Sequence, residues 1–82
     1  TALASGPWHA ARQNTAGWQY MTPDERVEHQ RRMRGFNSLA ECRTYQEAHH
    51  QRMADRAVRT GATLKRKAGS GCEQLHQKGK LK

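Results

Sequence analysis

The sequence predicts a small all-α protein, a helical hairpin with two main helices over about residues 23–34 and 39–60. Three observations lead to this prediction: two helix-start signals, a stripe of larger side chains at helical spacing, and two cysteines far apart in the chain. The 82 residues suffice for one domain. Only 34% of them are hydrophobic, so the core is expected to need help from a cross-link, a metal or a partner.

The first twenty residues are expected to form an irregular arm. Gly6, Pro7 and Gly17 interrupt this stretch, which shows no apolar periodicity. Its tryptophans, Trp8 and Trp18, are expected to pack back onto the helices. The predicted division is an irregular arm over 1–20, a helical-hairpin domain over 21–77 and a basic, disordered tail over 78–82.

The first helix has a complete start signal. Thr22 is a suitable N-cap, Pro23 suits the first helical position, and Glu25 can complete a capping box. The pattern ends at Gly35, which is expected to take the left-handed conformation that often closes a helix.

A second start signal follows almost at once. Ser38 and Glu41 can form another capping box, and Gly61 marks the end of the helix that they begin. Because the link between the two helices is so short, they are expected to fold back on each other with Phe36 filling the turn. The stripe that faces the core is Leu39, Cys42, Tyr45, Gln46, His49, Met53 and Ala57.

Beyond the second helix the sequence predicts a basic linker and one more helical turn, from Cys72 to Gln77, with Leu75 facing inward. The spacing of Cys42 and Cys72 excludes a two-cysteine zinc knuckle or a thioredoxin-like pair. In an oxidising compartment they would form a disulfide, worth roughly 3–4 kcal/mol, that ties the C-terminal segment across the second helix. Two free thiols in a cytosolic protein are the alternative.

The net charge of +8 favours anionic partners, namely nucleic acid, phospholipid head groups or acidic proteins, unless it only keeps a poorly cored protein in solution. No run approaches the ~20 apolar residues of a membrane span. The opening segment 1–5 has the small-x-small pattern of a signal-peptidase site, with cleavage after Ala4. It predicts an exported, periplasmic protein; an arbitrary boundary is the alternative.

The histidines and methionines indicate a metal site. His29 and Met33 lie four apart on the first predicted helix, and His49 and Met53 lie four apart on the second, beside His50. Imidazole and thioether together suit copper, above all Cu(I), because this ion prefers soft sulfur and borderline nitrogen.

Antiparallel pairing of the helices brings Met21 to the open end of the hairpin, near the donors of the second helix. His29 is expected nearer Cys42 and Tyr45, so it and Met33 are weaker candidates. The alternative is that the methionines belong to the core and the second-helix histidine is packed with one hydrogen bond. The predicted ligands are Met21, His49, His50 and Met53.

The basic residues also allow a phosphate-binding surface, on which Trp8, Trp18 and Tyr20 would stack. A helix–turn–helix would require a third helix and base-reading side chains at its start, so nucleic-acid binding is only the third choice. No catalytic triad and no glycine-rich loop after a strand is present, so no enzyme activity is expected. The cations of this surface would be Arg31, Arg32, Arg34, Arg52, Arg56, Arg59 and Lys65 to Lys67.

Several short motifs resemble a group of small exported proteobacterial proteins, mostly uncharacterised. The matching segments are Met21-Thr22-Pro23-Asp24-Glu25-Arg26, Met33-Arg34-Gly35-Phe36, Glu41-Cys42-Arg43-Thr44-Tyr45, His49-His50-Gln51-Arg52-Met53 and Gly71-Cys72-Glu73-Gln74-Leu75. The resemblance implies export, a paired Cys42 and Cys72, and a link to copper handling through a Met- and Gly-rich leader that many members carry. Here Trp8, His9 and Trp18 stand in its place. A looser similarity is to the Spy-like periplasmic stress chaperones, which are basic and often dimeric.

Together these features favour a periplasmic metal-binding protein in metal resistance or envelope stress, with copper as the expected metal. The alternative is a basic protein-interaction module, or a chaperone-like homodimer, that binds an acidic protein without metal.

Overall fold

The computed structural model describes residues 8–66 and 71–81, and this part of the chain is all-helical, without strands. Its α-helices are α1 (Pro23–Gly35), α2 (Leu39–Arg59) and α3 (Gly71–Gln77), preceded by a 3₁₀ turn, η2 (Trp18–Tyr20). None of the described helices has the length and apolar character needed to cross a membrane. The predicted cleavage pattern at 1–5, the linker segment 67–70 with Lys67 and Gly69, and the last residue lie outside the described residues.

The start of α1 is the predicted capping box. The Thr22 hydroxyl accepts from the Glu25 N–H (3.1 Å), and the Glu25 carboxylate accepts from the Thr22 N–H (2.9 Å). The predicted left-handed closure at Gly35 is wrong, because Gly35 is the last helical residue and has no positive φ. Phe36, in an extended conformation, leads the chain out of the helix instead.

The second helix begins and ends where the sequence predicts. The Ser38 hydroxyl accepts from the Glu41 N–H (3.1 Å), which is one of the two bonds of the predicted capping box. At the other end Gly61 has φ +83, the left-handed value expected after a helix. Cys42, His49, Met53 and Ala57 of the predicted stripe are all buried.

The disulfide between Cys42 and Cys72 is present, with 5.7 Å between the two Cα atoms. It ties α3 to the first turns of α2, as predicted, and Leu75 is buried beside it. The other members of this core cluster come from distant parts of the chain: Trp8, Met33 and Leu81.

The C-terminal tail differs from its prediction. In place of disorder over 78–82, residues 78–81 fold back on α3, where the Lys80 N–H donates to the Leu75 carbonyl (3.0 Å) and Leu81 is buried. The core has few large apolar side chains, and burial of Leu81 adds one. The favourable free energy of this burial exceeds the cost of ordering the polar residues beside it.

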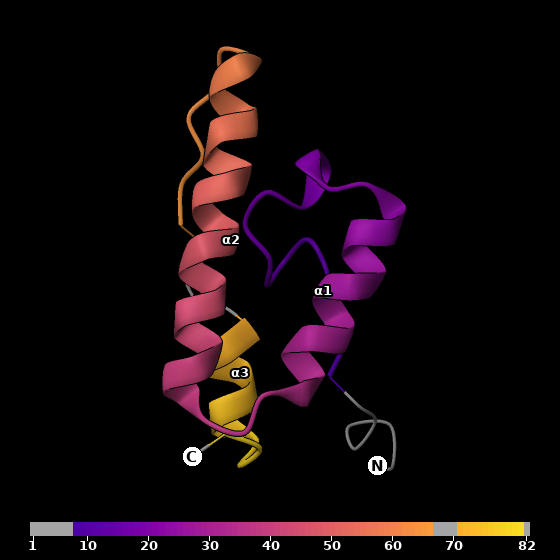
Figure 1. The fold of residues 1–82 in the computed structure, drawn as a ribbon, viewed down its shortest axis with the longest axis vertical. Coiled ribbons are helices and arrows are strands. Elements are labelled where there is room, and N and C mark those ends of the chain that lie inside the picture. Colours follow the sequence, from indigo (N-terminus) through magenta and orange to yellow (C-terminus); the bar gives the residue numbers. More distant parts are fainter. Residues whose placement is uncertain (1–7, 67–70, 82) are drawn as a thin grey trace.

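The N-terminal arm lies between α1 and α2 at the ends away from their link (Figure 1). The Arg26 side chain of α1 donates to the Trp18 carbonyl (2.8 Å), and Arg56 of α2 donates to the Tyr20 carbonyl (2.8 Å). The closest backbone packing joins α2 to α3 and α2 to η2. A closely packed two-helix hairpin is therefore not confirmed, while the predicted packing of Trp8 onto the helices is seen.

Gly17 allows the arm to approach α2, and its replacement gives a first prediction. Gly17 has φ +82, and a Cβ there would lie 2.4 Å from the Cβ of Met53. Gly17→Ala is therefore expected to destabilise the protein by about 2–3 kcal/mol in urea unfolding, through backbone strain and steric overlap.

Gly61→Ala is the matched control, because Gly61 has φ +83 but open space around its Cα. It should lose only the left-handed strain, about 1 kcal/mol. Equal losses in the two variants would contradict the close approach of Gly17 to Met53.

Candidate functional site

Two histidines face each other between α1 and α2. The ring centroids of His29 and His49 are 4.4 Å apart, with 35° between the ring planes, and the two residues are 4% and 5% exposed. Nδ1 of His29 and the hydroxyl of Tyr45 are hydrogen-bonded at 2.9 Å. Nε2 of His49 is buried and has no hydrogen-bond partner among the described residues. One ring nitrogen of the pair is thus buried without a polar contact, which is unusual in a native core.

Burial keeps both imidazoles neutral. It lowers the pKa of His29 to about 4, helped by the nearby His49, and it lowers the pKa of His49 to about 4, helped by the positive charge of Arg52. Neutral imidazole is the form that binds metal ions, so neither ring would have to lose a proton at pH 7 to act as a ligand.

Two thioethers accompany the histidines. Met21 and Met53 are both buried, and they line one cavity of about 320 Å³ together with His29 and His49. Met53 lies one turn after His49 on α2, and Met21 follows η2 directly before the α1 cap. The capped helix start and the 3₁₀ turn therefore fix Met21 at the wall opposite α2.

Charged side chains also surround this cavity, and Glu25 and Arg32 line it. The Arg56 guanidinium forms two 2.6 Å hydrogen bonds with the Glu25 carboxylate and so joins α2 to α1. This pairing holds the pKa of Glu25 at about 2. The guanidinium of Arg32 lies over the Tyr45 ring, 5.0 Å from its centroid.

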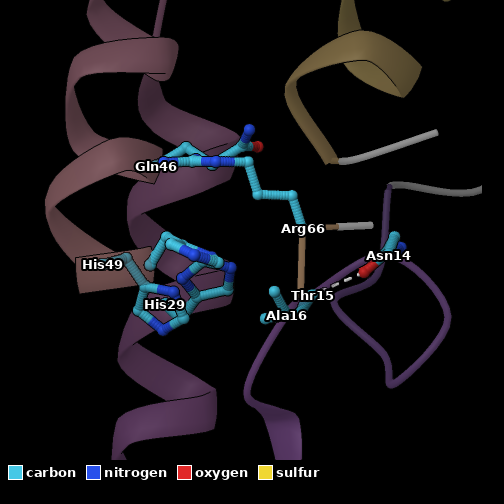
Figure 2. A pocket seen from close by; sticks show the side chains of 8 residues that line it. Asn14, Thr15, Ala16, His29, Gln46, His49 and Arg66 are labelled. Carbon is cyan, nitrogen blue, oxygen red and sulfur yellow. Dashed lines mark hydrogen bonds between the residues drawn. The ribbon is translucent and has the colours of Figure 1, made fainter. Parts of the chain in front are cut away.

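A second, smaller cavity of about 120 Å³ lies on the other side of the histidine pair. Figure 2 shows the rings of His29 and His49 facing the arm, which contributes Asn14, Thr15 and Ala16. Arg66 reaches across this cavity, and its guanidinium pairs with the Glu47 carboxylate. The arm therefore covers one side of the pair.

The predicted ligands are divided between these places. Met21, His49 and Met53 share the larger cavity, whereas His50 lines the smaller one. His29 contacts Tyr45 as predicted but also lies against His49, so it belongs to the same cluster.

Met33 does not join them. Its Sδ lies 3.7 Å from the Cys42 Sγ, in the core around the disulfide. A step of four helical residues moves about 6 Å along the axis, which carries Met33 from the level of His29 to that of α3.

Sequence reasoning placed Tyr45 near His29 but did not include the hydrogen bond between them, and it missed the arm as a neighbour of the histidines. Tyr45 lies on the predicted stripe of α2, so its place toward α1 could be predicted, but its bond to His29 had no local signal. The arm has no periodic pattern, and the burial of Thr15 beside the histidines depends on contacts across the whole chain.

The groups proposed for phosphate binding are mostly engaged within the chain. Trp8 is buried in the core, so its indole is not open for base stacking, and Arg26 lies over the Trp18 ring, 4.7 Å from its centroid. Arg31 and Arg56 are paired with Glu28 and Glu25. Lys67 lies outside the described residues.

Within residues 8–66 and 71–81, no three His, Cys, Asp or Glu side chains cluster as metal ligands. The cluster described above is of another kind, two imidazoles with two thioethers. Comparisons with protein-family models, with curated proteins and with solved structures give no match to this chain.

Proposed function

We propose that this chain is a small exported protein that binds Cu(I) between α1 and α2, in metal resistance or envelope stress. The proposed ligands are Met21, His29, His49 and Met53. The observation that carries the proposal is the His49 Nε2, which is buried without a partner among residues 8–66 and 71–81, beside a second neutral imidazole and two buried thioethers. A bound ion would give that nitrogen the contact that these residues do not supply.

The donor set favours Cu(I) over harder ions. Thioether sulfur is a poor ligand for magnesium, calcium or manganese, and a soft monovalent ion prefers it together with imidazole. Tyr45 would not bind the ion itself but would orient a ligand, because its hydroxyl is hydrogen-bonded to the His29 ring. In this proposal the ion lies between α1 and α2, which the ion pair of Glu25 and Arg56 holds together.

Export is part of the proposal because the scaffold depends on a disulfide. The Cys42–Cys72 bond persists in oxidising compartments and is rare in the cytosol.

The experiment is an anaerobic Cu(I) titration of the oxidised protein against a chromophoric competitor. We expect one equivalent to bind, and His49→Gln should weaken it by about 100-fold or more, beyond the usual effect of removing a second-shell partner. His50→Gln is the matched control, since His50 is adjacent in sequence but lines the other cavity, and it should leave the affinity unchanged.

Equal losses in His49→Gln and His50→Gln would contradict the site, and so would the absence of a bound equivalent. If the protein instead bound an acidic protein in a salt-sensitive and metal-independent way, the interaction-module alternative would take its place. The excess of cations supports that alternative, because most described glutamates are already paired, namely Glu25, Glu28, Glu47 and Glu73.

A further inference from the structure

Three sulfur atoms from three helices meet in the centre of the core. Met33 comes from α1, Cys42 from α2 and Cys72 from α3, and these residues are only 1%, 0% and 0% exposed. The Met33 Sδ lies 3.7 Å from the Cys42 Sγ, and Cys42 is bonded to Cys72. The cluster is separate from the His–Met cavity, which none of the three residues lines.

We infer that reduction of the disulfide turns this cluster into a second Cu(I) site, with two thiolates and one thioether as ligands. Metal–sulfur bonds of about 2.3 Å place the sulfurs of a planar three-coordinate site about 4 Å apart. The Met33 and Cys42 sulfurs are already near that separation. Thiolate and thioether are the donors that select Cu(I).

The reductant is a dithiol compound or dithiol protein in the compartment where the chain resides. A dithiol transfers two electrons and two protons to the Cys42–Cys72 bond, which becomes two thiols while the dithiol becomes a disulfide. Cu(I) then displaces the two thiol protons and remains in its +1 state. The complex carries one net negative charge, within a chain of net charge +8.

Hydrogen bonds independent of the disulfide keep Cys72 near Cys42 after the bond is broken. The Arg43 guanidinium on α2 pairs with the Glu73 carboxylate on α3 at 2.9 Å, and the Trp8 indole N–H donates to the side-chain amide oxygen of Gln74 at 2.9 Å. The Cys72 N–H also donates to the Gln46 side chain on α2 (3.4 Å). The three sulfurs are therefore held close without the covalent link.

The surroundings of the cluster are apolar and favour a soft ion. Trp8, Leu75 and Leu81 are buried around it, and Phe36 packs against the same core. A strongly hydrated ion would lose its water there without oxygen ligands in return, whereas Cu(I) bound by three sulfurs needs none.

The test counts Cu(I) bound by the full chain before and after reduction with a phosphine, without oxygen and with a chromophoric competitor. We expect the reduced protein to bind one equivalent more than the oxidised protein, with sulfur ligation in X-ray absorption. The result is a difference between two redox states. A failure of the proposed His–Met site would lower both counts equally and leave the difference intact.

Met33→Leu is the decisive variant, because leucine fills a similar volume without the sulfur. It should weaken the additional equivalent by at least about tenfold, the lower end of what loss of a second-shell partner costs. Leu75→Ile is the matched control, because it alters the packing of the same core and keeps all three sulfurs, and it should leave the additional equivalent unchanged. The inference would be overturned if the oxidised and reduced proteins bound the same number of Cu(I) ions. It would also be overturned if Met33→Leu did not weaken the additional ion, because the two cysteines alone would then account for its binding.

Discussion

Lowering the pH from 6.5 to 4 is expected to destabilise the metal-free protein by several kcal/mol. His29 and His49 have pKa values of about 4 in the folded chain, against an ordinary 6.5. Between these values the unfolded chain binds protons that the folded chain cannot, so stability falls as the pH falls and the loss is complete near pH 4. Each histidine contributes roughly 3 kcal/mol at about 1.4 kcal/mol per pH unit. This loss is comparable to the whole stability of a marginal domain.

The charged groups around the pair do not reverse this direction. Arg52 and Arg56 oppose protonation of His49, and Glu25 is the one neighbour that favours it. The carboxylate of Glu25 keeps its charge down to a pKa of about 2, so its pairing with Arg56 is lost only as the pH falls from about 4.5 to 2. The histidines therefore reduce the stability between about pH 6.5 and 4, and loss of the Glu25 charge reduces it between about pH 4.5 and 2.

Urea unfolding of copper-free protein at pH 7, 5.5 and 4 measures the effect. His49→Gln should show a smaller loss between pH 7 and 4 than the wild type, because one buried titrating group has been removed. His50→Gln should keep the full loss, since His50 lies at the smaller cavity. An unfolding midpoint that does not change between pH 7 and 4 would contradict the burial of a neutral pair.

The helix boundaries could be predicted because their signals are local. The Thr22 cap, the Ser38 cap and the glycine at 61 lie within one turn of the helix ends that they define, and each of these ends is observed. The stripe of α2 is equally local, since helical periodicity alone selects Cys42 and Met53 for burial. Pairing of the cysteines followed from their number and the expected compartment.

The centre of the site could not be predicted in the same way. The meeting of His29 with His49 depends on the arm, which separates the helices at one end and has no periodic pattern of its own. The position of Trp8 at the disulfide, at the other end of the molecule, also depends on contacts over more than sixty residues, such as its 2.9 Å bond to Gln74. The spacing of residues along one helix therefore identifies candidate ligands, but it does not show which residues of other segments they meet.

Removal of the disulfide is expected to lower the free energy of unfolding by about 3–4 kcal/mol, because the bond closes a loop over a sequence separation of 30 residues. The double variant Cys42→Ala and Cys72→Ala should show this loss in urea unfolding. Trp8 packs on the disulfide core, so its fluorescence in a Trp18→Phe background should report the loosening of α3.

Arg43→Ala is the control for this second prediction. It removes a different α2–α3 link, the exposed pair with Glu73, which is expected to contribute less than about 1 kcal/mol. If Arg43→Ala lowered the free energy of unfolding as much as the double cysteine substitution does, the surface ion pair would stabilise α3 as strongly as the disulfide. That result would contradict the role given to the disulfide. Reduction removes the same covalent constraint as the double substitution. Cu(I) bound at the three sulfurs of the reduced chain should restore part of the lost free energy of unfolding, in proportion to the logarithm of the Cu(I) concentration. The double cysteine variant lacks the thiolates of this second site, so a second equivalent of Cu(I) should not stabilise it.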